Sequence, residues 1–598
     1  MINWLDNRTG IRHLLSAVLF EKIPGGSRWR YVWGSTLTFT FFVQVVTGII
    51  LWMAYSPSVQ TAWESVFYIQ YEMSSGWLLR GVHHYTAQAM TILLVLHLMQ
   101  VIIDGAYRAP REINFWFGIA LLNLVLALSL TGYLLPWDQK GYWATKVTTS
   151  LMAATPIIGP GLEKLVVGGA EYGHHTLTRF FAFHAGVLPA AVVALIAGHI
   201  YLFRRHGITP KQPLRKPDAM FWPDQVLKDA VACLAVFATI LLFVLKGKLY
   251  GDGHLGAPAE PTEPYAAARP EWYFLFLFQF LKYFPGEREI YGTLVIPGAV
   301  MGLICLMPFI GRWRVGHFFN IFVMVLLLGG IGVLTYLAVN EDRKNPEYVQ
   351  AAAAANRAAE RVKTLAQAPT GIPVEGAVAL LRNDPLTQGP KLFAIHCASC
   401  HRYAGRDGLG TVPGDEPSAA DLKGFASREW LTKLISIDHI TSDAFFGKTA
   451  FSEGKMAKFV ERKVAQFDGT EKEQLRKAII ALSAEARLPQ QADMDQAESS
   501  LIEEGKNHLL NDIGCADCHE FHFEDEDATG PDLTGYGSKE WLTAMIGNPT
   551  HERFYGDKND RMPAFATEGI LNSSQISLLA DWLRNDWYEP EALAATAE

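Results

Sequence analysis

The sequence predicts an all-α protein in two parts, a bundle of seven membrane-spanning helices followed by two tandem α-helical domains. Seven apolar runs, each near the roughly 20 residues that a bilayer requires, lie before Asn340. Everything after Asn340 is polar, and one segment of this second part occurs twice. The 598 residues exceed one domain, and the net charge of −8 sums two unlike parts and excludes little.

The membrane part begins with a polar segment. Residues 1–30 predict a short amphipathic helix on the membrane surface rather than a cleavable signal peptide. The predicted spans are 31–54, 78–104, 113–135, 180–203, 227–246, 290–310 and 317–339. We divide them into a four-helix core, 31–210, and a three-helix companion, 211–340. Lys and Arg gather in the N-terminal segment and in the second, fourth and sixth connections, which predicts a cytoplasmic N-terminus and a C-terminal part outside.

Two of the spans carry a pair of histidines each. His83 and His97 are 14 residues apart, and His184 and His199 are 15 apart. Both separations are close to four helical turns, so each pair lies along one stripe, its members about 21 Å apart. Two such helices facing each other would make two bis-histidine sites across the bilayer. Iron porphyrin uses this ligation for electron transfer, because both axial positions are filled. The spacing therefore predicts two non-covalent b-type haems.

Glycines repeat the histidine spacing. Gly34 and Gly48 in one span, and Gly118 and Gly132 in another, are also 14 residues apart. A flat macrocycle between helices needs positions without a side chain, and glycine destabilises a helix unless something requires it. The alternative is ordinary packing of helices through small residues. Beside the histidine pairs, we interpret these glycines as part of the haem sites.

The polar part is a linker and a repeat. Residues 341–386 predict a linker that contains an Ala-rich, charged and exposed helix. Two domains, 387–490 and 491–598, are predicted because ADLKGFASREWLTKLI (420–435) matches PDLTGYGSKEWLTAMI (531–546).

A Cys-x-x-Cys-His motif precedes each copy of this repeat. The residues are Cys397, Cys400 and His401 in the first copy and Cys515, Cys518 and His519 in the second. Two thiols that form thioethers and a histidine that ligates iron are the attachment motif of haem c. The alternative is one zinc site shared by both Cys pairs. For the sixth iron ligand we predict Met456 in the first copy and Met562 in the second, against the alternative of surface or core methionines.

Four segments carry a family resemblance. GWLLRGVH, TLTRFFAFH, LLPWDQKGYW and PEWY resemble cytochrome b of the quinol-oxidising cytochrome bc complexes, over most of residues 1–340. Within that family the chain looks more like the plastoquinol-type bf branch, with cytochrome b and its three-helix companion fused. The 15-residue histidine spacing, the PWDQKGYW wording and the absence of an eighth predicted span favour this branch. That branch tethers an extra haem to a Cys where this chain has Val32, so we expect no third covalently fixed membrane haem.

The resemblance implies bifurcated oxidation of quinol on the outer side. One electron would go to a Rieske iron–sulfur protein and the other through both b haems to an inner quinone site. The implied outer quinone-binding residues are Pro270, Glu271, Trp272 and Tyr273. Glu271, a carboxylate in an apolar aromatic segment, would accept a proton, and Tyr273 would hydrogen-bond the quinone. The alternatives are a Glu that stabilises a helix start and a Tyr that only packs.

Basic and acidic residues suggest further contacts. Arg80 and Arg179 are placed to neutralise propionates of the outer haem, or else they extend to the interface as membrane arginines do. On the inner side, Asp229, Arg204 and Arg205 are candidates for quinone binding and proton delivery. Basic residues there also satisfy the orientation rule, which is the alternative reading.

The resemblance also implies partners. All four outer cysteines are committed to haem, so none is left for a Rieske cluster, and activity requires a separate Rieske subunit. The fused dihaem part would replace cytochrome c-one or f and pass electrons to a soluble or membrane-bound acceptor. We expect a homodimeric complex with quinone and lipid in the bacterial cytoplasmic membrane, and no nucleic acid. The competing hypothesis is a haem b anchor or conduit for a separate dehydrogenase or reductase, which would not need PEWY.

Overall fold

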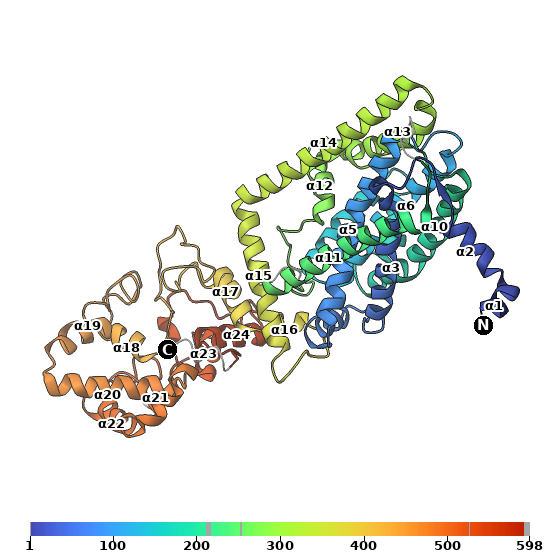
Figure 1. Ribbon diagram of the computed structural model, residues 1–598. Coiled ribbons are helices and arrows are strands. Elements are labelled where there is room, and N and C mark those ends of the chain that lie inside the picture. Colours follow the sequence, from blue (N-terminus) through green and yellow to red (C-terminus); the bar gives the residue numbers. More distant parts are fainter. Residues whose placement is uncertain (1, 211–216, 251–253, 525–526, 591–598) are drawn as a thin grey trace. The chain divides into compact units, whose positions relative to one another are not determined.

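The computed structural model describes residues 2–210, 217–250, 254–524 and 527–590. The chain divides into two compact units (Figure 1). The membrane unit comprises Met1–Lys363 and Ile372–Val378, and the C-terminal unit comprises Thr364–Gly371 and Ala379–Glu598. The predicted division between the core and its companion, at residue 211, lies outside the described residues.

Seven helices of the described residues are long and apolar enough to cross a membrane, which confirms the predicted number. They are α3 (Val32–Trp52), α5 (Gly76–Ile103), α6 (Glu112–Leu134), α9 (His174–Ala182) continued by α10 (Leu188–His206), α11 (Val226–Tyr250), α13 (Ile296–Ile310) and α14 (Arg314–Lys344). Most boundaries lie within a few residues of the prediction. The last helix runs about one turn further at its C-terminal end, because the polar segment NEDRK is also helical.

Pairwise packing of these helices builds the core. Helix α3 packs against α5, and helix α6 packs against α10. Helix α11 packs against both α3 and α5 (Figure 1). Val82, Ile240 and Val244 form the buried contact between α5 and α11. Helix α13 packs against α6 and α14, around the buried residues Met307 and Met324. The four helices with the predicted histidines and glycines are therefore neighbours.

The N-terminal segment is two short helices rather than the single one predicted. Helices α1 (Ile2–Thr9) and α2 (Ile11–Leu19) meet at Gly10, whose φ of 63° breaks the helix. Strand β1 (Lys22–Ile23) then pairs antiparallel with β2 (Ala219–Met220), which connects this segment to the chain that follows α10.

Short helices form the connections that carry PWDQ and PEWY. They are α4 (Ala62–Phe67), α7 (Gln139–Ala153), α8 (Gly159–Val167), a 3₁₀ turn (Trp272–Phe274) and α12 (Leu275–Leu281). Asp138 begins α7 by accepting a hydrogen bond from the Gly141 N–H at 2.7 Å. Leu134, Trp137, Tyr142 and Phe180 bury these connections against α6 and α9.

Helix α15 (Pro346–Ala366) forms the predicted linker helix, but it packs on the membrane unit instead of standing free. Glu360 lies 3.4 Å from His254, and the Lys363 ammonium lies 5.1 Å from the ring centre of Tyr71. These contacts hold the C-terminal part of α15 against the membrane unit.

The C-terminal unit is also helical. Its helices are α16 (Val378–Arg382), α17 (Pro385–His396), α18 (Arg428–Leu434), α19 (Lys455–Arg462), α20 (Gly469–Glu485), α21 (Ala492–Ala497), α22 (Ser499–Asn511), α23 (Lys539–Gly547) and α24 (Ser573–Leu583). The duplicated segments have the same local structure. Trp430 donates its indole N–H to the Asp421 carbonyl at 2.9 Å, and Trp541 donates to the Asp532 carbonyl at 3.0 Å.

Helix pairing in this unit crosses between the repeats. Helix α17 of the first repeat packs against α24 of the second, and α22 of the second packs against α20 of the first. The two repeats therefore share their cores, and a boundary at residue 490 separates them along the chain only.

Candidate functional site

The four membrane histidines form two facing pairs. His83 of α5 and His184 of the fourth span have ring centroids 6.3 Å apart, and His97 and His199 lie 6.4 Å apart. An imidazole–metal bond is about 2 Å long, so one ion fits between the rings of each pair. The structure thus brings together the residues predicted to hold two bis-histidine haems.

Second hydrogen bonds set the protonation of these rings. The Nδ1 atom of His184 lies 3.0 Å from the Leu128 carbonyl, and that of His199 lies 3.1 Å from the Asn114 carbonyl. A carbonyl oxygen can only accept, so Nδ1 carries the proton and Nε2 keeps its lone pair for a metal. His83 has Thr47 as its Nδ1 partner, at 2.9 Å from Oγ1. Thr47 was missed in the sequence because its contact with His83 crosses between helices.

Each predicted glycine faces one of these imidazoles. A Cβ atom built on each glycine measures how close the nearest ring carbon of its histidine lies. The distances are 3.8 Å from Gly34 to His97 and 3.3 Å from Gly48 to His83. They are 3.5 Å from Gly118 to His199 and 2.6 Å from Gly132 to His184. Contacts below 3.0 Å require something to move, so Gly132 leaves no room for a methyl group. The absence of a side chain at each glycine thus leaves room for the imidazole that faces it.

The fourth span holds His184 in a π-helical turn. This turn, Phe183–Val187, joins α9 to α10. A π turn adds one residue to a helix, and such turns concentrate at functional sites. The added residue explains how a 15-residue spacing keeps His184 and His199 on one stripe, opposite the 14-residue pair of α5.

The PEWY segment lies beside the histidine pair formed by His83 and His184. Trp272 donates its indole N–H to the Gln88 side chain at 3.3 Å, and Gln88 follows His83 by five residues. On the other side, the Tyr133 hydroxyl donates to the Arg269 carbonyl at 3.2 Å, next to Gly132. Residues 270–273 are therefore attached to both α5 and α6 at the level of His83 and His184.

Glu271 is paired with a lysine that the sequence did not single out. The Lys140 ammonium lies 3.5 Å from the Glu271 carboxylate, whose side chain is 15% exposed, and 5.5 Å from the ring centre of Tyr133. Lys140 belongs to PWDQKGYW, so the motif contained it, but only the fold shows its partner. Burial raises the pKa of Tyr273 to about 12, so its hydroxyl keeps its proton near neutral pH and can donate a hydrogen bond.

Asp138 acts on Lys140 through the start of helix α7 rather than by contact with Glu271. Burial raises the pKa of its carboxyl, while its bond to the Gly141 N–H opposes that shift. The carboxylate also lies against Gly256, where a built Cβ would be 2.9 Å from Oδ2. Asp138 therefore fixes the start of α7, two residues before Lys140.

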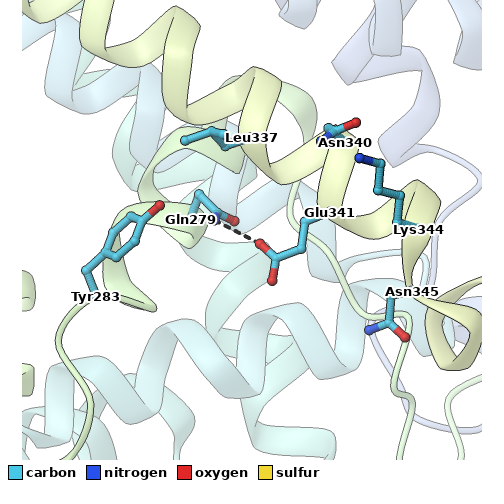
Figure 2. A pocket seen from close by; sticks show the side chains of 7 residues that line it. All are labelled: Gln279, Tyr283, Leu337, Asn340, Glu341, Lys344 and Asn345. Carbon is cyan, nitrogen blue, oxygen red and sulfur yellow. Dashed lines mark hydrogen bonds between the residues drawn. The ribbon is translucent and has the colours of Figure 1, made fainter.

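A hollow of about 460 Å³ lies further along the same connection, between α12 and α14 (Figure 2). Gln279, Tyr283, Leu337, Asn340, Glu341, Lys344 and Asn345 line it. Gln279 donates to Glu341 at 2.9 Å across the hollow. None of residues 270–273 lines it, so it is separate from the segment beside the histidine pair.

Known families match the part of the chain that carries these features. The profile described as Cytochrome b/b6/petB matches residues 21–207, and the one described as Cytochrome b(C-terminal)/b6/petD matches 258–355. Cytochrome b of Rhodobacter capsulatus is 33% identical over 316 residues, which cover 50% of this chain and 71% of that protein. The chain belongs to the cytochrome b family. Both halves of the family's helical bundle thus occur in one polypeptide.

Other cytochrome b relatives are similar in the four-helix core. The menaquinol:cytochrome c reductase cytochrome b subunit of Geobacillus thermodenitrificans is 38% identical over 217 residues, 35% of this chain and 97% of that protein. Cytochrome b6 of a Synechococcus species is 36% identical over 207 residues, 35% and 96% of the two chains. A chain of the solved structure titled "Hyperthermophilic respiratory Complex III" is 28% identical, with a TM-score of 0.50, and the match covers 60% of this chain and 95% of that one.

A cytochrome b binds b-type haem, and the residues present fit that group. Two facing imidazoles with free Nε2 atoms and four cleared glycine positions provide the ligands and the space. One turn before His83, the Arg80 guanidinium donates to Gln70 at 2.9 Å. Arg179 donates to the Leu165 carbonyl, which ties the start of the fourth span to α8.

The three candidate residues of the inner side lie in different surroundings. Asp229 is buried and accepts hydrogen bonds from Ser35 and Gln225, both at 2.8 Å. Arg204 forms an ion pair with Glu21 at 3.0 Å, and Arg205 is exposed. The two carboxylate oxygens of Asp229 thus hold helix α11 to α3 and to Gln225, the residue before α11.

The family matches end at residue 355. The two Cys-x-x-Cys-His motifs of the C-terminal unit are therefore judged from their local geometry. His401 Nδ1 lies 2.8 Å from the Ala420 carbonyl, and His519 Nδ1 lies 2.7 Å from the Pro531 carbonyl. Again a carbonyl acceptor fixes the proton on Nδ1 and leaves Nε2 free. Burial lowers the pKa of both imidazoles, which keeps them neutral at pH 7.

The four motif cysteines are free thiols of intermediate exposure, Cys397, Cys400, Cys515 and Cys518. A Cβ built at Gly530 would lie 2.5 Å from a ring carbon of His519, so this glycine gives the imidazole its space. Among the described residues, no three His, Cys, Asp or Glu side chains converge as a zinc site would require.

Proposed function

We propose that this cytochrome b is the membrane and dihaem c subunit of a bacterial quinol:cytochrome c-type oxidoreductase. Relatives named as menaquinol:cytochrome c reductase subunits, from Geobacillus thermodenitrificans and Bacillus subtilis, support this assignment. The match to a chain of a respiratory Complex III supports a multisubunit assembly. The complex would be homodimeric in the cytoplasmic membrane, with the N-terminus inside and the C-terminal unit outside, and would require a Rieske subunit.

The observation that carries the proposal is the Glu271–Lys140 pair beside the outer histidines. A partly buried carboxylate can take a proton from a bound quinol, and the Lys140 ammonium lies 3.5 Å from it. The Tyr273 hydroxyl, which stays protonated, can donate a hydrogen bond to a quinone oxygen. Trp272 is held to helix α5 by its hydrogen bond to Gln88.

When bound, the b haems supply one-electron transfer across the membrane. His83 and His184 would hold the outer one, and His97 and His199 the inner one. The other electron of the quinol would leave through the Rieske partner. On the inner side, Arg204 and Arg205 would attract a quinone, and Asp229 would deliver protons to it.

The C-terminal unit would receive electrons from the Rieske partner through two covalent c haems. Cys397 and Cys400 would attach the first, and Cys515 and Cys518 the second, with His401 and His519 as proximal ligands. Methionine thioethers as sixth ligands would raise their potentials, as an acceptor from quinol requires. A soluble or membrane-bound acceptor would take the electrons onward.

Glu271→Gln tests the outer site. The amide keeps the shape of the side chain but cannot accept a proton, so quinol-to-acceptor turnover of the purified complex should fall roughly 10²- to 10⁴-fold. The b-haem spectra should be unchanged. Glu287→Gln, on an exposed position of the same connection, is the matched control and should keep full turnover.

Two outcomes would contradict the proposal. Full turnover of Glu271→Gln across the pH range would remove Glu271 from quinol oxidation. A purified complex that carries no iron–sulfur subunit and transfers electrons only from a separate dehydrogenase would favour the haem b anchor instead.

A further inference from the structure

The exchange of helices in the C-terminal unit decides which methionine can reach which motif. Each Cys-x-x-Cys-His directly follows the first helix of its repeat, α17 or α22. Each methionine precedes the last helix of its repeat, Met456 before α20 and Met562 before α24. The first helix of each repeat packs on the last helix of the other repeat. The methionine before that last helix is therefore brought toward the Cys-x-x-Cys-His motif of the other repeat.

Close contacts fix this crossed pairing. A Cβ on Gly389 of α17 would collide with the Trp582 side chain of α24, so the two helices touch at this point. Similarly, a Cβ on Gly505 of α22 would collide with the Lys477 carbonyl of α20. The Lys477 ammonium also forms an ion pair with Glu504 at 2.6 Å.

The first motif lies in a core built mainly by the second repeat. Phe393 and Cys397 share this core with Phe565 and Trp582. The Phe565 ring lies 6.4 Å from the ring of His396, the residue before Cys397. Met562, three residues before Phe565, borders this core and also the larger neighbouring one. The segment that carries Met562 is therefore held against Cys397.

The second motif is bordered by the helix that carries Met456. The Lys455 ammonium donates to the Thr529 hydroxyl at 3.3 Å, and the Thr529 N–H donates to the Cys518 carbonyl at 3.0 Å. At the other end of α19, the Lys463 ammonium would lie 2.7 Å from a Cβ built on Gly514, the residue before Cys515. Helix α19 is thus attached at both ends to the second motif, with Met456 next to the first of these contacts.

We infer that each c haem takes its sixth ligand from the other repeat: Met562 serves the haem of His401, and Met456 serves the haem of His519. This inference rests on the proposed haem c attachment and replaces the pairing that the order along the chain predicts. The two haems would then depend on each other's repeat for their potentials, because a thioether ligand raises the potential of its iron.

Single-haem variants of the full chain test the pairing. Cys397→Ser with Cys400→Ser leaves only the His519 haem, and Cys515→Ser with Cys518→Ser leaves only the His401 haem. In the first background, Met456→Leu should abolish the ferric methionine–iron charge-transfer band and lower the midpoint potential, while Met562→Leu should change neither. The second background should give the reverse. Met494→Leu, on an exposed position of α21, is the control.

The outcomes separate this inference from the proposed function. If each methionine affects the haem of its own repeat, the crossed pairing is overturned, while haem attachment stands. If haem staining shows no covalent haem on the unmodified chain, the proposed function fails instead. If neither background accumulates, a photo-crosslinking benzoylphenylalanine at Tyr403, whose ring stacks on Trp582 at 4.3 Å, gives a second test in the two-haem protein. Crosslinks to residues 573–583 are expected, and crosslinks to 469–485 would overturn the pairing.

Discussion

At the scale of single residues, the membrane sites depend on the absence of side chains as much as on ligands. Gly132→Ala places a methyl group 2.6 Å from the His184 ring, where either the imidazole or the macrocycle must give way. We expect the outer b haem to be lost or to bind roughly 10- to 100-fold more weakly, as when a metal ligand loses its support. Redox-difference spectra of the b haems measure this.

The control for Gly132→Ala is Gly302→Ala in α13, where a built Cβ meets no atom within 4 Å. This variant should keep both b haems and gain helix stability, because alanine favours helices over glycine. Equal haem content in the two variants would show that the glycine is a packing residue only.

The spacing of the histidines and glycines along single helices could be predicted from the sequence, while the contacts between helices could not. His83 with His97 and Gly118 with Gly132 follow from a period of about 3.6 residues. Lys140 lies inside PWDQKGYW and Thr47 inside a span, but their contacts with Glu271 and His83 appear only in the fold. Such contacts depend on how helices pack, which a single sequence does not encode locally.

At the scale of helices, the π turn at His184 makes a prediction about spacing. Deletion of Gly186 from this turn shortens the histidine separation to that of α5, and a regular α-helix then keeps both rings on one stripe. Deletion of Ala89 from α5, which has no such turn between its histidines, rotates His97 by about 100° relative to His83. The first deletion should keep both b haems and the second should lose one, by haem extraction and spectra. Equal loss in both would show that the turn is required as it stands.

Helix positions could be predicted because each span is long, apolar and bounded by charge. The pairing of the C-terminal helices could not, because the duplication offers α17 two similar partners, α20 and α24. Nothing in α17 alone distinguishes them. The choice is made by contacts such as Gly389 with Trp582, which unite residues far apart in the chain.

At the scale of the whole molecule, the haem content of the purified chain directly tests the proposed set of four haems. The purified chain should contain b and c haems in a ratio of about one, and only the c haems should remain on a denaturing gel. Pyridine haemochrome spectra and haem staining of the full-length band check this. A ratio far from one would contradict the proposed set of four haems, whichever methionine serves which iron.

Deletion of helix α24 should affect the proposed haem of His401 rather than the proposed haem of His519. A stop codon after Leu571 deletes α24, and with it Trp582 and the wall of the core that contains Cys397. Loss of one methionine band and a lower potential for the His401 haem are expected in spectroelectrochemistry. A stop after Pro590, which leaves every described helix in place, is the control. Damage confined to the His519 haem would contradict the crossed arrangement.

The crossed helices also impose an order on biosynthesis. The thiols of Cys397 and Cys400 are synthesised before α24, the helix whose residues share a core with Cys397. Until α24 has been synthesised, these thiols stay uncovered, open to the haem attachment that we propose and to oxidants as well. The first repeat therefore cannot complete its packing until the second has been synthesised.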